Sequence, residues 1–292
     1  MNISAGTGGQ NRPSRLPPSF VLALGAVTAL GPLSIDMYLP ALPSLAADFR
    51  ADPSLVQLTL SACILGLALG QLVVGPLSDI HGRRRPLLVG LAAYAAASLL
   101  CALAPSAGAL IAMRFLQGLA GSAGLVIATA MVRDLYTGAA AARFFSMLML
   151  VMGLAPILAP LLGAQVLLLA SWHGIFAILT VAGVLLIAVA ATLLPETLSH
   201  ECRHGGGLGA TIATFGRFFT DRRFISYALA AGLAFAAMFA YIAGSPFVIQ
   251  RIHGVSPQAF GMLFGMNAFG LIAASQINGR FVERASPRTL ML

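Results

Sequence analysis

The sequence predicts an all-α membrane protein, a polytopic bundle of about eight transmembrane helices. Of its 292 residues, 59% are hydrophobic and 9% are charged, whereas an ordinary soluble domain has about 25% charged residues. Its mean hydropathy is +0.91. Apolar runs of roughly 20 residues recur along the chain, and about 20 helical residues cross the hydrocarbon core of a bilayer.

Eight apolar runs are long enough to be spans, and we expect each to be one helix. The polar residues 1–19 precede them as a disordered cytoplasmic tail, and no small-residue cleavage site closes the first run, which we expect to stay as an anchor. The predicted units are a six-helix bundle at 20–194, a cytoplasmic linker at 195–223 and a partial second bundle at 224–292, with two helices and the start of a third. The spans are placed at 20–39, 55–77, 87–105, 108–132, 144–168, 173–194, 224–244 and 259–279.

The positive charge is distributed unevenly between the predicted loops. All 17 basic residues are arginine, and the net charge is +8. If loops alternate between the two sides, only Arg50, Arg114 and Arg251 fall elsewhere, so 17 less 3 leaves 14 arginines on one side. The positive-inside rule assigns that side and the amino terminus to the cytoplasm. The charge therefore indicates membrane topology and lipid contact, and we expect no nucleic-acid partner.

An internal repeat predicts the size of the complete architecture. Residues 52–79 align without gaps on residues 256–283, so that Pro53 meets Pro257 at an offset of 204 (257 less 53), and Gly66 meets Gly270. The second and eighth spans are thus expected to be equivalent members of two repeats. Two six-span repeats of this length need roughly 400 residues and twelve spans. We therefore expect the chain to be truncated at its carboxy-terminal end.

The stretch GPLSDIHGRRR at 75–85 concentrates charge between the second and third spans, in a predicted loop of under ten residues. The simplest interpretation is that its arginines only fix orientation. The fuller interpretation is a gate: a glycine for close helix approach, an aspartate that accepts hydrogen bonds, and a glycine for a tight turn. The gate residues are Gly75, Asp79, Gly82, Arg83 and Arg84.

This stretch resembles the G-x-L-S-D-x-x-G-R-R signature of the major facilitator superfamily, although Ile80 stands where a basic residue is usual. LGPLSIDMYLPALPSLA, RFLQGLAGSAG, LVMGLAPILAPLLGA and the string ETL after the sixth span are similar to the drug/proton antiporters of the bicyclomycin-resistance (Bcr/CflA) type. The resemblance implies a major-facilitator-like fold and a secondary transporter without cofactor or metal. It also implies a monomer if the protein is full length.

Two charged residues lie within the predicted spans, Asp36 in the first and Arg114 in the fourth. Each lies within about six residues of the same membrane boundary, at most roughly 9 Å deep, so we expect them to be able to pair. A purely structural ion pair is one possibility. The other is proton coupling, in which movement of the arginine or entry of a cationic substrate loads or releases a proton. The resemblance implies the coupling role for Asp36, Arg114, Gln117 and Gly118.

The fifth span carries a face rich in small residues and proline, at Gly153, Pro156, Pro160 and Gly163. Small residues let helices approach closely, and prolines bend them, so packing alone would account for this face. The resemblance implies in addition that it is an antiporter motif.

We expect a central substrate cavity, lined in part by Tyr38, Gln117, Phe235, Tyr241 and Asn267 beside Arg114. The leading hypothesis is proton-coupled export of small amphipathic drugs across the bacterial inner membrane by alternating access. The alternative is a truncated membrane fragment without transport activity. An enzyme is not expected, because no catalytic motif is present, and the His200–His204 cluster is interpreted as a solvated linker rather than a metal site.

Overall fold

The computed structural model describes residues 18–203, 216, 218 and 220–282, and within this range eight helical segments are long and apolar enough to cross a membrane. The eight predicted spans are therefore confirmed. The helices are α1 (Pro18–Asp36), η1 (Leu39–Ala41), α2 (Leu42–Asp48), α3 (Pro53–His81), α4 (Arg84–Ala102), α5 (Ala107–Leu135), α6 (Gly138–Leu169), α7 (Trp172–Leu193), η2 (His200–Cys202), α9 (Arg222–Pro246), the π-helical η3 (Phe247–Ile252) and α10 (Pro257–Val282).

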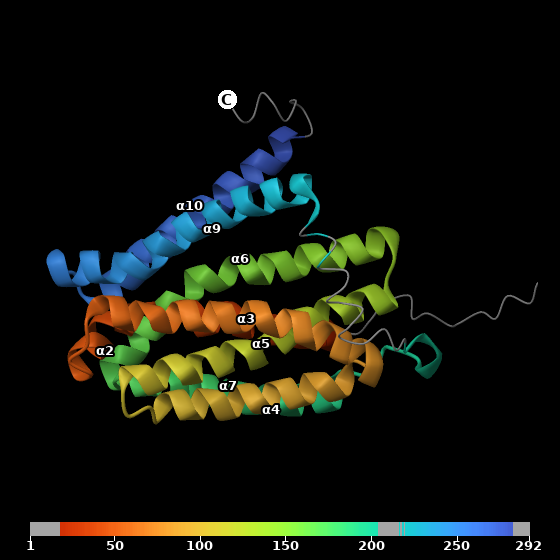
Figure 1. Ribbon diagram of the computed structural model, residues 1–292, viewed down its shortest axis with the longest axis horizontal. Helices are drawn as coiled ribbons and strands as arrows, with labels where there is room; N and C mark the ends of the chain where they lie inside the picture. The colour runs from red at the N-terminus through yellow and green to blue at the C-terminus, as the bar shows by residue number, and fades with distance from the viewer. Residues whose placement is uncertain (1–17, 204–215, 217, 219, 283–292) are drawn as a thin grey trace, which may run out of the picture.

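The long helices alternate in direction, and α9 and α10 form a tilted pair beside α6 (Figure 1). Because of this alternation, arginines at helix ends gather at one end of the bundle: Arg84 begins α4, Arg133 lies in the last turn of α5, and Arg222 begins α9. We call this the arginine end. The other end, which holds α2 and η3, is the α2 end.

Helix starts follow local capping chemistry. Asp52 Oδ1 accepts a hydrogen bond from the Ser54 N–H at 2.9 Å, and Ser106 Oγ accepts one from Ala109 N at 3.2 Å. Such side chains satisfy N–H groups that a helix leaves unpaired in its first turn. Pro53 and Pro257, which the repeat aligns, are the first residues of α3 and α10.

The closest helix contact joins α3 and α5 through two glycines. A Cβ on Gly66 would lie 2.1 Å from the carbonyl oxygen of Phe115, and a Cβ on Gly118 would lie 2.0 Å from that of Cys63. Glycine is required at both positions because the backbones themselves touch. This contact fixes the register of α5, the helix that carries Arg114.

Two expectations about segment boundaries are corrected. The predicted loop between the second and third spans is helical as far as His81, and only Gly82 and Arg83 separate α3 from α4. A helix satisfies its own backbone polar groups, so the polar residues after Gly75 extend α3 rather than unwinding it. Residues 18–19 of the predicted tail begin α1, while the rest of the tail, the linker at 204–215 and the start of a third helix at 283–292 lie outside the described residues.

Candidate functional site

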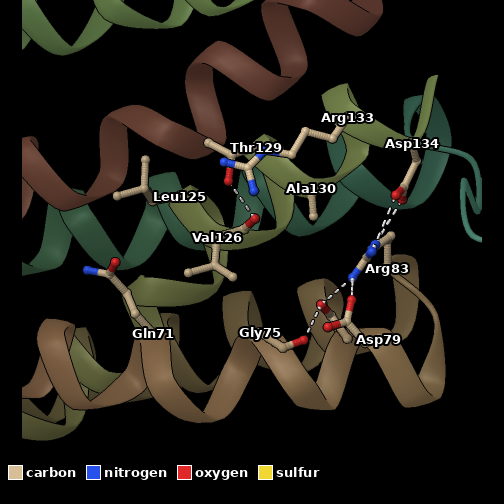
Figure 2. Close-up of a pocket in the computed structure, with 11 residues that line it drawn as sticks. Gln71, Gly75, Asp79, Arg83, Leu125, Val126, Thr129, Ala130, Arg133 and Asp134 are labelled. Carbon is tan, nitrogen blue, oxygen red and sulfur yellow. Dashed lines mark hydrogen bonds and ion pairs between the residues drawn. The ribbon is translucent and has the colours of Figure 1, made fainter. Parts of the chain in front are cut away.

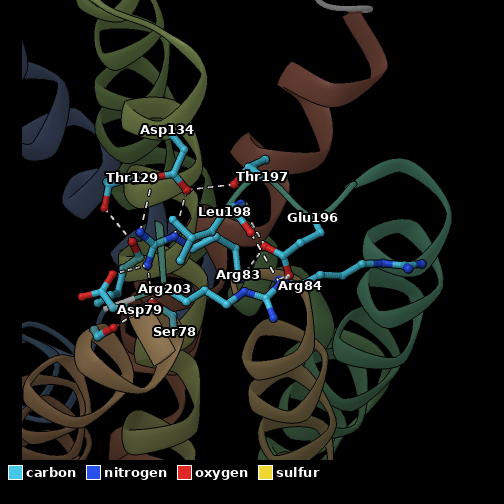
Figure 3. A network of polar contacts seen from close by, with 12 residues as sticks. Ser78, Asp79, Arg83, Arg84, Thr129, Asp134, Glu196, Thr197, Leu198 and Arg203 are labelled. Carbon is cyan, nitrogen blue, oxygen red and sulfur yellow. Dashed lines mark hydrogen bonds and ion pairs between the residues drawn. The ribbon is translucent and has the colours of Figure 1, made fainter. Parts of the chain in front are cut away.

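Arg83 is the centre of a charged network at the arginine end. Its Nε donates to Asp134 Oδ2 at 2.9 Å and its Nη2 donates to Asp134 Oδ1 at 3.3 Å. Its Nη1 donates to Asp79 Oδ1 at 2.5 Å and to Ser78 Oγ at 2.8 Å (Figure 3). One guanidinium thus ties the end of α3 to the end of α5.

The charge of Arg83 is held by this environment. Its side chain is only 8% exposed, and burial by itself lowers the pKa of the guanidinium. The hydrogen bonds and charges of Asp134 and Asp79 outweigh that effect and raise the pKa above its ordinary value. Arg83 is therefore a permanent cation between two carboxylates.

Glu196, in the segment after α7, caps the start of α4. Its Oε1 accepts the backbone N–H of Arg83 at 2.8 Å, and its Oε2 accepts that of Arg84 at 3.2 Å. Thr197 follows it and donates from Oγ1 to Asp134 Oδ2 at 2.9 Å. A carboxylate at a helix amino terminus is favourable, so the segment after α7 is held against the α3–α4 turn.

The protonation of Glu196 follows from these contacts. Burial raises the pKa of its carboxyl, but hydrogen bonds from the backbone N–H groups of Arg83, Leu198 and Arg84, together with the charge of Arg203, outweigh burial and lower it. Arg203 Nη2 lies 3.9 Å from Glu196 Oε2. The cap is thus an ionised carboxylate at neutral pH.

The predicted gate residues are distributed around this network. Gly82 has a φ of +87°, as expected for a tight turn. Arg84 Nη2 donates to the carbonyl oxygen of Ala191. Gly75 is in ordinary contact with Val126, at 3.9 Å from where its Cβ would be, so the close helix approach expected there is found at Gly66 and Gly118 instead.

A pocket of about 440 Å³ opens between α3 and α5 beside the network (Figure 2). Both carboxylates that share Arg83 line this pocket; the side chain of Asp79 is 57% exposed and that of Asp134 is 15% exposed. The two carboxylates therefore differ in how far solvent reaches them. The remaining lining residues include Gln71, Thr129 and Arg133.

Arg114 is the centre of a second polar cluster, inside the membrane-spanning part. The residue is fully buried, and its Nη1 donates to Gln117 Oε1 at 2.6 Å. Gln117 Nε2 in turn donates to Ser98 Oγ at 2.8 Å. The guanidinium carbon lies 4.8 Å from the ring centroid of Tyr38 and 5.5 Å from that of Phe176. Two of its nitrogens, Nε and Nη2, have no hydrogen-bond partner among the described residues.

The expected pairing of Asp36 with Arg114 is not formed. Asp36 is 6% exposed at the end of α1, and its carboxylate makes no hydrogen bond or ion pair with any of the described residues. Equal depth along two helices does not fix the direction in which each side chain points. The bundle thus holds a buried arginine and a buried aspartate that do not neutralise each other.

The predicted cavity residues fall into separate groups. Tyr38 and Gln117 flank Arg114 in the interior, and Tyr38 Oη is hydrogen-bonded to Thr59 Oγ1. On the exposed side of α9 and α10, Asn267 Nδ2 donates to Tyr241 Oη at 3.0 Å. Phe235 lies farther along α9, with its ring centroid 4.5 Å from that of Phe239.

The small-residue face of α6 contacts two neighbouring helices. A Cβ on Gly163 would lie 1.7 Å from the carbonyl oxygen of Met37, beyond the end of α1, and a Cβ on Gly153 would lie 3.6 Å from Ile272 of α10. Pro160 is buried, and its carbonyl oxygen lies 3.0 Å from where a Cβ on Gly261 would be. Pro156 lies between these contacts within the helix. The face thus packs α6 between α1 and α10.

Sequence reasoning missed two residues of the arginine-end network, Asp134 and Glu196. Each lies within two residues of the end of an apolar run, at the end where the arginines gather. An acid at that position was a usable signal, because opposite charges that lie close together attract each other. Glu196 entered only as part of the ETL string.

The fold and these clusters define a class: a multi-span helical membrane protein with charged groups inside its bundle, as in secondary transporters. The chain belongs to the Major Facilitator Superfamily, whose family model matches residues 24–292. It is therefore a transporter-family protein and not an enzyme.

Several curated relatives cover almost the whole chain. The Bacillus subtilis protein named "Uncharacterized MFS-type transporter YdgK" is 49% identical over 91% of this chain and 66% of its own length. The bicyclomycin resistance protein homolog of Haemophilus influenzae is 34% identical over 93% of this chain and 68% of its own. The chloramphenicol resistance protein of Pseudomonas aeruginosa is 32% identical over 93% of this chain and 64% of its own length. The chain thus spans about two thirds of the length of these relatives.

Solved structures agree on the fold. A bacterial homologue of the human lysosomal transporter Spinster, in an inward-facing and occupied conformation, has a TM-score of 0.75 at 17% identity, over 92% of this chain and 62% of that one. The human organic anion transporter MFSD10 has a TM-score of 0.63 at 20% identity, over 87% of this chain and 70% of that one. At these identities the likeness establishes the major facilitator fold alone.

Proposed function

We propose that this protein serves proton-coupled export of small amphipathic drugs across the bacterial inner membrane, by alternating access. The observation that carries the proposal is that Asp36 and Arg114 are both buried and are not paired with each other. Ionisable groups in a membrane interior are costly and mark ion or proton pathways by default. An unpaired buried carboxyl is a group at which a proton or a cationic substrate is taken up.

The incomplete hydrogen bonding of Arg114 supports the same proposal. It retains two unpartnered nitrogens within the described part of the chain, although each buried N–H without an acceptor costs free energy. An arginine that keeps free donors can change partner as the bundle changes conformation. Asp36 is the acidic partner that we propose for the alternate state, and substrate entry near Tyr38 would compete for the same charge.

The substrate class is inferred from relatives and from the aromatic residues. Two relatives carry the names of bicyclomycin and chloramphenicol resistance. Tyr241 and Asn267 offer a hydrogen-bonded polar pair on α9 and α10, and Phe235 offers an apolar face. We propose that these residues contact the substrate together with Tyr38 and Gln117, and that the α6 face from Gly153 to Gly163 serves antiport by packing against α10.

Topology and organisation complete the proposal. The positive-inside rule favours the cytoplasm for the arginine end and for the amino terminus. We propose residues 20–194 as the first bundle, 195–223 as the linker and 224–292 as part of the second bundle, surrounded by lipid, with the protein a monomer if it is full length. The Arg83 network then lies at the cytoplasmic side as a gate. Reporter fusions at Arg143 and Asp52 test this orientation, with cytoplasmic and external signals expected respectively.

The alternative is a chain without transport activity. A transport assay separates the two. Drug uptake driven by an imposed proton gradient is measured in everted vesicles that contain this chain, the chain extended with the last third of the Bacillus subtilis relative, and the same chimera with Asp36→Asn. The amide keeps the shape of the carboxyl but carries no proton. Equal uptake by the Asp36→Asn chimera and the parent chimera would refute proton coupling at Asp36. Uptake by the parent chimera but not by the 292-residue chain would support the alternative for the short chain.

A further inference from the structure

Three glutamine side chains join the two parts of the molecule at the α2 end. Gln57 Nε2 of α3 donates to the carbonyl oxygen of Ala243 in α9 at 3.2 Å. Gln250 Nε2 of η3 donates to that of Pro40 in η1 at 3.2 Å. Gln258 Nε2 of α10 donates to that of Ala164 in α6 at 2.9 Å. Each bond connects residues 18–193 with residues 222–282.

These three bonds lie at one end only. Toward the arginine end, α9 and α10 diverge from the rest of the bundle (Figure 1). A Cβ on Gly232 of α9 would meet no atom within 4 Å, although α10 still contacts α6 at Ile272, which lies 3.6 Å from where a Cβ on Gly153 would be. At the α2 end, by contrast, Phe247 and Phe260 are buried in the same apolar cluster as Tyr38. The two parts are therefore closed together at the α2 end and apart at the other.

Two of the acceptor carbonyls lie where the helix backbone is irregular. In an α-helix the N–H of Phe247 would bond to the carbonyl of Ala243, but here it bonds to the carbonyl of Gly244. The 3-10 partner of the Pro40 carbonyl would be residue 43, which is proline and has no N–H. A glutamine amide supplies a donor to a carbonyl at each of these places. Ala164 lies within regular helix, where a carbonyl can accept a second bond through its other lone pair.

Two exposed residues of opposite charge lie at the same end as the three glutamines. Asp52 begins α3, and hydrogen bonds from Ser54 lower the pKa of its carboxyl, with a further contribution from the positive charge of Arg251 in η3. Opposite charges thus lie on the two sides of the same junction, although these two side chains form no ion pair with each other. Both side chains are exposed at this end, so the attraction between them is screened by salt.

We propose that Gln57, Gln250 and Gln258 form a clasp that holds the α2 end closed, and that release of this clasp opens that end. The proposal deepens the proposed function, since alternating access requires one side to close while the other opens. Neutral amide-to-carbonyl bonds suit a reversible closure, because each is directional but of modest net strength. Three of them therefore favour the closed state without making it permanent.

The clasp is tested by a distance measurement in the full 292-residue chain. Spin labels are placed at Leu169, after which α6 ends, and at Ile252, the last residue of η3. Both side chains are largely exposed, 92% and 73%, so the labels disturb little packing. Cys202 is replaced by Ser, and the buried Cys63 and Cys101 are kept. The distance distribution between the labels then reports the opening of the α2 end.

Methionine is the informative replacement, because it matches glutamine in length but donates no hydrogen bond. In the triple variant Gln57→Met, Gln250→Met, Gln258→Met, the ratio of long to short label distances is expected to rise about tenfold or more. Gln258→Met alone is expected to raise it a few-fold, and serves if the triple variant does not fold. Gln165→Met is the matched control, an exposed glutamine of α6 at the same end for which the described residues offer no hydrogen bond.

An unchanged distance distribution in both the triple variant and Gln258→Met would overturn the clasp. The same shift in Gln165→Met would also overturn it, because the effect would then not depend on the three bonds. The readout is independent of transport. If the α2 end opened in the variants but the vesicles transported no drug, the clasp would stand and the proposed function would be refuted. If drug was transported but the label distances were unchanged, the clasp would be refuted and the proposed function would stand.

Discussion

Arg83 donates to both carboxylate oxygens of Asp134, from Nε at 2.9 Å and from Nη2 at 3.3 Å, and so joins the α3–α4 turn to the end of α5. Bidentate contacts of this kind are stronger and more specific than single ones. Asp79, the other carboxylate that contacts Arg83, accepts a hydrogen bond from Nη1 alone. The network is therefore asymmetric, with Asp134 as its structural anchor and Asp79 as its exposed member.

This asymmetry predicts unequal effects of neutralising the two acids. Asp134→Asn removes a bidentate, mostly buried contact and also disturbs the hydrogen bond from Thr197, so it is expected to destabilise the protein by about 2 kcal/mol. Asp79→Asn alters an exposed pair and is expected to cost less than about 1 kcal/mol. Thermal unfolding of the purified variants in detergent compares them. Equal losses of Tm would contradict the anchor role of Asp134.

Much of the fold follows from the sequence, because a helix that crosses a bilayer needs a long apolar run and eight such runs are present. The tight turn at Gly82 and the gathering of arginines at one end were also predictable, since both depend on local residue type and helix alternation. Pairing was not. The depth of Asp36 and Arg114 follows from residue counts, but their mutual direction depends on helix rotation, which close contacts such as Gly66 on Phe115 determine.

The second prediction concerns the turn itself. A Cβ on Gly82 would lie 2.3 Å from Glu196 Oε2, at a φ of +87°. With its ψ of 171°, this backbone lies in a region essentially limited to glycine, so Gly82→Ala is expected to strain the backbone by about 1–3 kcal/mol and in addition to displace the Glu196 cap. Gly138→Ala is the matched control, because Gly138 also has a positive φ, of +58°, but its Cβ would meet no atom within 4 Å. Calorimetry in detergent should show a larger loss of Tm for Gly82→Ala, and equal losses would mean that the contact with Glu196 adds nothing.

The third prediction is a pH dependence of the Glu196 cap. The pKa of Glu196 is lowered in the folded protein from its ordinary value of 4.5, so its contribution to stability is present above about pH 4.5 and is lost as the pH falls through the lowered value. Glu196→Gln is thus expected to lower Tm by a few degrees at pH 7 and to have a diminishing effect in acid. Tm is measured for both proteins from pH 7 to pH 3. A difference that stayed constant over this range would show that the ionised carboxylate is not what stabilises the turn.

The fourth prediction concerns the helix that presents Arg114. Gly118 lies one turn after Arg114 on α5, and a Cβ there would lie 2.0 Å from the carbonyl oxygen of Cys63 and 3.0 Å from Leu67 N. These atoms belong to the backbone of α3, so the two helices must separate or slide, and Gly118→Ala is expected to cost about 3 kcal/mol or more.

Gly108→Ala provides the comparison within the same helix. Gly108 is exposed and its Cβ would meet no atom within 4 Å, so this substitution is expected to be neutral or to stabilise by at most about 1 kcal/mol through helix propensity. Unfolding in detergent measures both variants. A shift of α5 along α3 would also move the guanidinium of Arg114 relative to the rings of Tyr38 and Phe176, which lie on other segments. Gly118→Ala as stable as Gly108→Ala would show that the α3–α5 contact is looser than the backbone distances imply, and that the position of Arg114 does not depend on it.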